Sequence, residues 1–376
     1  MRSVSIVGVG TTDFGILEGM SLKKMASLAT NRAIVDAGIN RKEIRAFYLG
    51  NYIGGILEGQ ETLAPVVACD KGEGACCSAG IALRQGFMLI ASGVYDFVLV
   101  GGVEKMSGAS TAKNTEALAA GMDKDMEGYT GLTFPGYFAL VAHRHMYEYG
   151  TTIEQIGLVS VKNRKNAVKN PRARFRKETT LEEVLNSRLV TDPLKLFDCC
   201  PISDGAAAAV LCPTEIARNF TDKPIEIMGS GHGLGNSTSY AMEGPSCTAT
   251  VYAAKQAFDM AGIKPSDVDV AEIHDCFTIA EIVDSEDIGF FERGKGGPAV
   301  EEGLTQVDGK IPINTSGGLL SKGHPVGATG LGQVFEIVRH LRGEHENQVK
   351  DAEIGLAMNL GASGLVSTVT ILKGAV

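Results

Sequence analysis

Hydrophobic residues follow two patterns along the chain, which predict strands that alternate with helices. Val4 to Gly10 is an apolar run that ends in glycine, so we expect a buried strand there. From Leu22 to Ala37 the apolar positions recur at helical spacing, and Gly38 follows as a residue suited to a helix end. Ile44 to Leu49 and Phe97 to Val100 are short apolar runs typical of strands. The alternation predicts an α/β fold with a parallel sheet.

The helix-to-strand pattern recurs later in the chain. Residues 33–51 (AIVDAGINRKEIRAFYLGN) align without gaps with residues 257–275 (AFDMAGIKPSDVDVAEIHD), and 95–102 match 351–358 more weakly. We therefore predict two similar halves, 1–218 and 219–376. In the second half we expect strands at 224–227, 354–358 and 365–372 and a helix at 331–341. The strand ends at 50–51 and 274–275 are equivalent, and open α/β sheets bind ligands at such ends.

A polar segment from about 106 to 190 interrupts the first half, and we interpret it as an insertion. Within it, residues 162–177 carry eight Lys or Arg side chains. A solvated face is the ordinary explanation for such a run, and a patch that binds a phosphorylated ligand is the alternative. After the insertion we expect a strand at 194–200 and a helix from Ala206 onward.

Composition narrows the function classes. The chain has 376 residues, 44% of them hydrophobic, and a formal net charge of −9, which argues against nucleic-acid or anionic-membrane binding. Apolar runs are too short for a membrane span, and the start of the chain resembles a strand more than a signal peptide. Eight cysteines without CxxC spacing argue against a zinc ribbon or a disulfide scaffold. We expect a reducing, cytoplasmic location.

Reactive side chains gather at predicted strand ends and helix starts. Cys76 and Cys77 lie in GACCSAG, directly before apolar residues at helical spacing. A helix N-terminus stabilises a thiolate, as a cysteine nucleophile requires, although two buried core cysteines would give the same local pattern. His274, Cys276 and His324 complete the set, and one cleft can collect them.

A cysteine beside a histidine is the minimal activated thiol, and a second thiol can move a proton. Taken alone, His324 before Pro325 could be a turn residue and Cys276 a core thiol. The joint pattern favours nucleophilic catalysis.

Four motifs together resemble the thiolase superfamily: GACCSAG, HDCF, SGGLLSKGHPVGATG and NLGASG. The resemblance is nearest to the sterol-carrier-protein-type and archaeal acetyl-CoA acetyltransferase branch. It covers nearly the whole chain, including AIVDAG, VLVGGVEKMS and LFDCCPISDGAAAAVL. It implies a five-layered α-β-α-β-α fold of two like halves with an inserted loop domain.

The resemblance also assigns roles. Cys76 matches the nucleophile that becomes acylated; Cys77 is the alternative, because Gly80 lies three residues after it, as in relatives. His324 matches the histidine that activates the nucleophile, and His274 matches an oxyanion-hole histidine. Cys276 matches the acid/base cysteine of HDCF.

Further positions follow from the same resemblance. Asn359 stands where other branches carry the second cysteine, and the N–H groups of Gly361 and Cys76 would form the other oxyanion hole. Two stretches depart from relatives: the short approach at 68–73, which bears on the local strand and the dimer contact, and residues 233–248, which bear on the acyl pocket.

The resemblance implies a CoA-dependent acyltransferase that cleaves a 3-oxoacyl-CoA, or condenses acetyl-CoA to acetoacetyl-CoA, through an acyl-cysteine. A bulky aromatic or dicarboxylic substrate such as benzoylsuccinyl-CoA is one alternative, and a non-catalytic CoA-binding subunit is another. A Cys-His hydrolase is disfavoured by HDCF and GHPVGATG. Coenzyme A is expected as a substrate, with no metal or permanent cofactor.

Expected partners are a second copy of the chain, as a homodimer or dimer of dimers, and a small OB-fold zinc-ribbon protein. No nucleic-acid or membrane partner is expected. The basic run 162–177 is expected to help hold the CoA phosphates.

Overall fold

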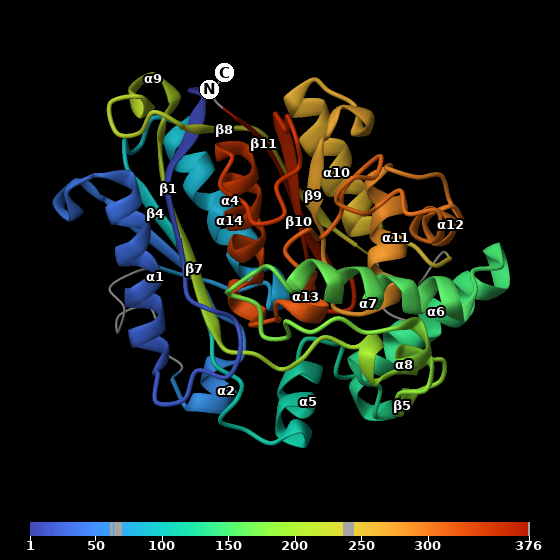
Figure 1. Ribbon diagram of the computed structural model, residues 1–376. Coiled ribbons are helices and arrows are strands. Elements are labelled where there is room, and N and C mark those ends of the chain that lie inside the picture. The colour runs from blue at the N-terminus through green and yellow to red at the C-terminus, as the bar shows by residue number, and fades with distance from the viewer. Residues whose placement is uncertain (61–62, 64–69, 236–243, 375–376) are drawn as a thin grey trace.

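The fold is organised around a mixed sheet. The computed structural model describes residues 1–60, 63, 70–235 and 244–374. Within that part of the chain, nine strands form one sheet in the order β3-β2-β4-β7-β1-β8-β11-β10-β9 (Figure 1). The first half contributes β1 (Val4–Thr11), β2 (Ala46–Gly50), β3 (Asp70–Gly72), β4 (Val98–Glu104) and β7 (Gly205–Pro213). The second half contributes β8 (Ile225–Leu234), β9 (Val270–Glu272), β10 (Ile354–Gly361) and β11 (Val366–Lys373).

The strands are partly parallel and partly antiparallel. β2 runs parallel to β3 and β4, and β9 runs parallel to β10. β7 is antiparallel to β4 and β1, and β10 and β11 form an antiparallel hairpin. The expected parallel sheet is therefore wrong, because a turn as short as the one between β10 and β11 can join only antiparallel strands. The halves meet where β1 pairs with β8, at Ser5↔Glu226 and Ile6↔Ile225.

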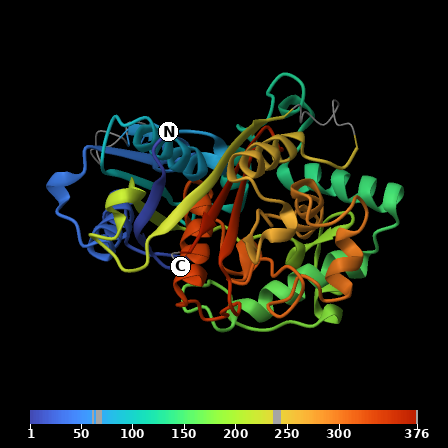
Figure 2. The ribbon, with the colours of Figure 1, turned by 90° about the horizontal axis from the view of Figure 1, so that it is seen from above.

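Helices cover both faces of the sheet and fill the space between its halves. α1 (Leu22–Ala37) packs on β1, β7 and β4, and α10 (Thr248–Ala261) packs on β8 and β11. α4 (Ser78–Ala91) and α14 (Thr329–Arg342) lie between the halves, where they contact strands of both and each other (Figure 2). One buried cluster joins Leu83 of α4 to Val334 of α14. The five-layered α-β-α-β-α arrangement is confirmed.

The repeat in the sequence corresponds to a repeat of elements. α1 ends at Gly38 with φ 63°, and α10 ends at Gly262 with φ 69°. Each is followed by a 3₁₀ turn, η1 (Arg41–Glu43) or η5 (Pro265–Asp267), and then by β2 or β9. Glycine suits both helix ends because a side chain would be strained at positive φ.

The segment between β4 and β7 is mainly helical and gathers below the sheet in Figure 1. It contains α5 (Thr111–Ala119), η3 (Gly128–Thr130), α6 (Phe134–Tyr149), α7 (Ile153–Ala167), α8 (Leu181–Leu185), β5 (Leu189–Thr191), β6 (Leu194–Lys195) and η4 (Leu196–Asp198). α7 packs on α11 (Thr278–Ile288), α12 (Gly296–Glu301) and α13 (Gly318–Ser321). The remaining short elements are α2 (Gly54–Glu58), η2 (Ala75–Cys77), α9 (Thr214–Ala217) and η6 (Val326–Ala328). The domain boundaries at 218/219 and about 106–190 stay predictions.

Two predicted elements are wrong. The run from Ala206 onward is not a helix but the buried strand β7, and most of 194–200 is β6 followed by a 3₁₀ turn. A continuous apolar run fits a buried strand and a buried helix equally well, so periodicity could not separate them. No helix within the described residues has the length and apolar character that crossing a bilayer requires.

Candidate active site

The two neighbouring cysteines face different surroundings. Both lie in η2, directly before α4, and both are buried. The Cys77 thiol donates a hydrogen bond to the Asn359 backbone oxygen, 3.1 Å away. Cys76 Sγ, one ring nitrogen of His274 and one of His324 all lie within 4.8 Å of one another. The structure therefore brings Cys76, and not Cys77, to the two histidines.

Close backbone packing places Cys76 at this position. A Cβ on Gly361 would lie 2.4 Å from the Gly74 oxygen and 2.9 Å from Cys77 Cβ, so only glycine lets β10 approach the cysteine turn. Apolar side chains line the other side of the thiol; the buried cluster contains Ile53, Cys76, Met106, Ala117 and Val326.

His324 has a fixed proton position. Its Nδ1 lies 2.7 Å from Thr329 Oγ1, and that hydroxyl donates to the Pro325 oxygen at 3.1 Å. Because a hydroxyl has one hydrogen, His324 Nδ1–H must be the donor to Thr329. The neutral ring therefore keeps its lone pair on Nε2, the form that a general base requires.

His274 packs against His324, with ring centroids 5.0 Å apart at an interplanar angle of 85°. Burial, together with the neighbouring His324, holds the pKa of His274 well below its ordinary value. Burial also lowers the pKa of His324 to about 3. Both rings are therefore neutral near pH 7, because desolvation disfavours the charged form.

The Cys76 thiol is harder to ionise than an ordinary cysteine. Burial, and then the charges of Cys77 and Glu104, raise its pKa to about 12, against hydrogen bonds from the backbone of Ala362 and of Cys76 itself. The expectation that this pKa is lowered is wrong, because desolvation outweighs the backbone hydrogen bonds to the thiol. A base must therefore take the thiol proton during attack.

Cys276 is buried in the same region. Its backbone oxygen accepts a hydrogen bond from the Cys200 N–H at 3.0 Å. Burial, and then the charges that Cys200 and Cys76 would carry, raise the pKa of the Cys276 thiol well above its ordinary value. A protonated Cys276 can donate a proton to a carbanion, as an acid/base role requires.

Asp275 holds the HDCF turn in place. Its carboxylate accepts hydrogen bonds from the Leu319 N–H at 2.7 Å and from Asn163 Nδ2 at 2.7 Å. A Cβ on Gly318 would lie 2.1 Å from Asp275 Oδ2, and Gly318 has φ +60°. Glycine in SGGLL thus allows the carboxylate to bind this backbone.

Sequence reasoning gave Glu104 no role, although it closes an apolar strand. This buried carboxylate accepts hydrogen bonds from Tyr52 N–H at 2.8 Å, Gly327 N–H at 3.2 Å and Asn51 Nδ2 at 2.8 Å. It therefore ties β4 to the GHPVGATG loop that carries His324. An acidic residue at the end of a buried strand was the available signal.

Among the described residues, two side-chain triplets have donor atoms close enough for a metal ion. Cys76, His274 and His324 form one, with a donor set typical of zinc. Glu336, His345 and Glu346 form the other, but its carboxylates already pair with arginines, as Arg172 does with both.

The basic run 162–177 does not form one surface patch. Lys162 is buried, with Nζ 2.7 Å from Glu281 Oε1, and Arg172 binds Glu336 and Glu346. The exposed members of the run are Lys165, Lys169, Arg176 and Lys177. Lys162 and Arg172 therefore balance internal carboxylates, and Arg164 and Arg174, which are half-buried, lie near the Phe175 ring. The four exposed cations are the ones most open to a phosphate.

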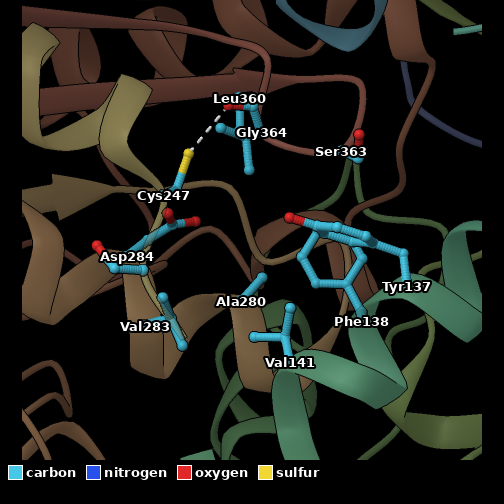
Figure 3. Close-up of a pocket in the computed structure, with 11 residues that line it drawn as sticks. Tyr137, Phe138, Val141, Cys247, Ala280, Val283, Asp284, Leu360, Ser363 and Gly364 are labelled. Atoms are coloured by element: carbon cyan, nitrogen blue, oxygen red, sulfur yellow. Dashed lines mark hydrogen bonds between the residues drawn. The ribbon is translucent and has the colours of Figure 1, made fainter. Parts of the chain in front are cut away.

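A small cavity lies between α6, α10, α11 and the β10–β11 turn. Figure 3 shows Cys247 and Asp284 on one side and Tyr137 and Phe138 on another. Its volume of about 20 Å³ holds roughly one water molecule. The predicted catalytic residues do not line it, but Leu360 does, between Asn359 and Gly361. Of the stretch 233–248, residues 236–243 lie outside the described residues.

Both halves of the chain match thiolase family models. Residues 4–215 match the family Thiolase, N-terminal domain, and residues 231–374 match the family Thiolase C-terminal domain-like. The chain belongs to the thiolase family, as the sequence motifs predicted.

Two similar proteins and one similar solved structure indicate the class of enzyme. The acetyl-CoA acetyltransferase of Methanothermobacter thermautotrophicus is 46% identical over 99% of this chain and 100% of its own length. The benzoylsuccinyl-CoA thiolase subunit BbsB of Thauera aromatica is 35% identical over 91% of this chain and 90% of its own. Among solved structures, the Ltp2–ChsH2(DUF35) aldolase superposes with a TM-score of 0.86 and 29% identity, covering 99% of this chain and 97% of that one. The chain is thus an acyltransferase enzyme of the thiolase type.

Proposed function

We propose that the protein transfers small acyl groups between CoA thioesters and carbon through an acyl-Cys76 intermediate. The observation that carries this proposal is the approach of Cys76 Sγ to ring nitrogens of both His324 and His274, within 4.8 Å. A thiol, a neutral base and a second imidazole at one buried point are the parts that thiolysis needs.

The thiolytic reaction assigns each group a step. His324 Nε2 takes the Cys76 proton while the sulfur attacks the 3-keto carbon of a 3-oxoacyl-CoA. The C2–C3 bond then breaks and its electron pair passes to C2 as a CoA-thioester enolate, which Cys276 protonates to acetyl-CoA. A second CoA thiol removes the acyl group from Cys76 and regenerates the free thiol. The reverse sequence is a Claisen condensation.

Hydrogen-bond donors stabilise the two charged states. His274 would hold the enolate oxygen of the thioester. The backbone N–H groups of Cys76 and Gly361 would hold the tetrahedral oxygen, and Ala362, whose backbone contacts Cys76 Sγ, adjoins them.

Acetyl is the acyl group that we favour. The acetyl-CoA acetyltransferase above shares 46% identity over 99% of this chain. A bulky aromatic or dicarboxylic 3-oxoacyl-CoA is the second candidate, supported by the 35% identity to BbsB. A non-catalytic CoA-binding subunit is disfavoured by the assembled Cys76, His274 and His324.

We also propose a small OB-fold zinc-ribbon partner, a homodimer or dimer of dimers, and a cytoplasmic location. The partner is supported by the relatives, because one is described as a thiolase subunit and another is a complex with a DUF35 protein.

Steady-state thiolysis tests the proposal. The purified chain, with CoA, should cleave acetoacetyl-CoA and give two acetyl-CoA. Cleavage of an aromatic 3-oxoacyl-CoA with a higher kcat/KM would select the bulky-substrate alternative. Cleavage of neither, with intact CoA binding, would select the non-catalytic alternative.

A further inference from the structure

We propose that Asn359 is a positioning residue that keeps the proton of His274 on Nε2, so that this imidazole donates a hydrogen bond to the substrate thioester oxygen. The inference rests on the proposed function. Asn359 Nδ2 lies 3.1 Å from His274 Nδ1. An amide nitrogen donates and does not accept, so His274 Nδ1 must be the acceptor. In a neutral ring the remaining proton is then on Nε2.

The surroundings of Asn359 favour this orientation of its amide. The residue is 2% exposed and sits in β10, opposite Thr368 of β11. A Cβ built on Gly330 would lie 2.3 Å from Asn359 Oδ1, and one built on Gly80 would lie 3.3 Å from it. Gly330 and Gly80 belong to the first turns of α14 and α4. Asn359 Oδ1 has no hydrogen-bond partner among the described residues, but it lies beside these first turns, whose partial positive charge favours the amide oxygen on that side and leaves the NH₂ for His274.

The two neighbouring histidines are thereby held in opposite tautomers. Thr329 leaves His324 with a bare Nε2, whereas Asn359 leaves His274 with a protonated one. One ring can accept the Cys76 proton while the other donates to an oxyanion. The same arrangement opposes metal binding by Cys76, His274 and His324, because a metal needs an unprotonated nitrogen on each ring.

Asn359→Asp tests the assignment with an isosteric change. A carboxylate only accepts, so it draws the proton to His274 Nδ1 and leaves Nε2 bare. At pH 8 we expect kcat for thiolysis to fall about 10²- to 10³-fold, as for loss of an oxyanion donor, with little change in the KM for CoA. Activity should partly recover at lower pH as the ring gains a second proton. The variant should also bind Co²⁺ with a thiolate-to-metal absorption band that the wild type lacks.

Asn114→Asp is the matched control, because Asn114 is another buried amide, whose Nδ2 donates to three backbone oxygens, those of Met106, Ala109 and Ser110. It should lose stability without gaining Co²⁺ affinity or a new pH profile.

Nitrogen-15 NMR of the histidine-labelled wild type shows directly which ring nitrogen of each histidine carries the proton, so it tests the inference even if Asn359→Asp fails to fold. His274 should be protonated at Nε2 and His324 at Nδ1, with signals assigned from His274→Gln and His324→Gln. A proton on His274 Nδ1, or a folded Asn359→Asp variant with wild-type kcat at pH 8, would overturn the inference. Failure of the wild type to cleave any 3-oxoacyl-CoA would instead overturn the proposed function, while the tautomer result would stand.

Discussion

At the scale of single residues, burial sets the protonation state of the candidate site. Cys76, His274 and His324 are each buried, and burial moves the thiol pKa up and the imidazole pKa values down. The resting site therefore holds a neutral thiol beside neutral rings and not a thiolate–imidazolium pair. Charges therefore form only when the thiol attacks, because the negative charge can then pass to the substrate oxygen.

This resting state predicts the pH dependence of alkylation. With a pKa of about 12, Cys76 should react with iodoacetamide at a rate that rises about tenfold per pH unit from pH 7 to 9, with no plateau. The measurement is the rate at which Cys76 itself is alkylated, followed by peptide mass spectrometry so that the other cysteines do not contribute. A plateau below pH 8 would reveal a preformed thiolate and contradict this protonation state.

Cys276 and His324 should have separable roles. Cys276→Ala should still acylate but should exchange the α-protons of acetyl-CoA with D₂O at least tenfold more slowly, because its thiol supplies the proton to the enolate. His324→Ala should lose acylation itself. Proton NMR of acetyl-CoA in D₂O measures the exchange; wild-type exchange by Cys276→Ala would remove it from the acid/base role.

The sequence motifs predicted which residues form the candidate site, but they could not predict the protonation of those residues. Motif register placed Cys76, His274, Cys276 and His324, and the geometry brings Cys76 to both rings. The direction of the Cys76 pKa shift was not predictable, because desolvation of the thiol depends on side chains that are distant in the sequence and pack around it in the fold. The role proposed for Asn359 had no signal in the sequence, because its partner, His274, lies 85 residues away.

At the scale of elements, Glu104 joins three segments that do not adjoin in the chain. Its carboxylate binds the backbone after β2 and the loop before α14. Burial raises its pKa from 4.5 to about 7, against hydrogen bonds from Tyr52, Ile53, Gly327 and Asn51. Because the folded form binds more protons than the unfolded chain in that window, this group's contribution to stability is lost as pH rises from 4.5 to 7.

Glu104→Gln should remove that pH dependence. The amide stays neutral, and Asn51, whose Oδ1 has no partner among the described residues, can turn to accept from it. Relative to the variant, the wild type should lose up to about 3 kcal/mol of unfolding free energy between pH 4.5 and 7. Urea unfolding across that range measures it; parallel curves for the two proteins would show that Glu104 is ionised throughout.

Element boundaries were predictable where local chemistry marks them. α1 ends at Gly38 as expected because glycine accepts a left-handed backbone there. β7 was mistaken for a helix because its small apolar residues carry no period that separates the two structures.

At the scale of the whole molecule, ion pairs tie the inserted segment to the middle layer. Arg172 binds Glu336 of α14 and also Glu346. Burial alone would raise the pKa of Glu336. The neighbouring charges outweigh burial and hold this pKa well below its ordinary value; they belong to Lys322, His345 and Arg172. Removing one of these cations leaves the buried Glu336 charge poorly compensated, which lowers the stability of the fold.

Arg172→Ala should therefore destabilise the fold by about 3 kcal/mol, since it leaves a buried charge short of a partner. Arg176→Ala, at an exposed position in the same run, should change stability by less than about 0.5 kcal/mol. Chemical denaturation compares the two variants. Equal small effects would mean that the Arg172 network contributes little.

The two-half architecture was predictable because residues 33–51 and 257–275 have similar sequences that align without gaps. The joining of both halves into one sheet was not, because it depends on two residue pairs between β1 and β8 that no local pattern marks.

Acylation mapping tests the central claim most directly. The wild-type protein is incubated with acetyl-CoA, quenched in acid, digested and analysed by tandem mass spectrometry. The acetyl group should lie on Cys76, it should vanish in Cys76→Ser and His324→Ala, and it should persist in Cys77→Ser. Acetylation of Cys77, or of neither cysteine in an enzyme that turns over acetoacetyl-CoA, would contradict the account.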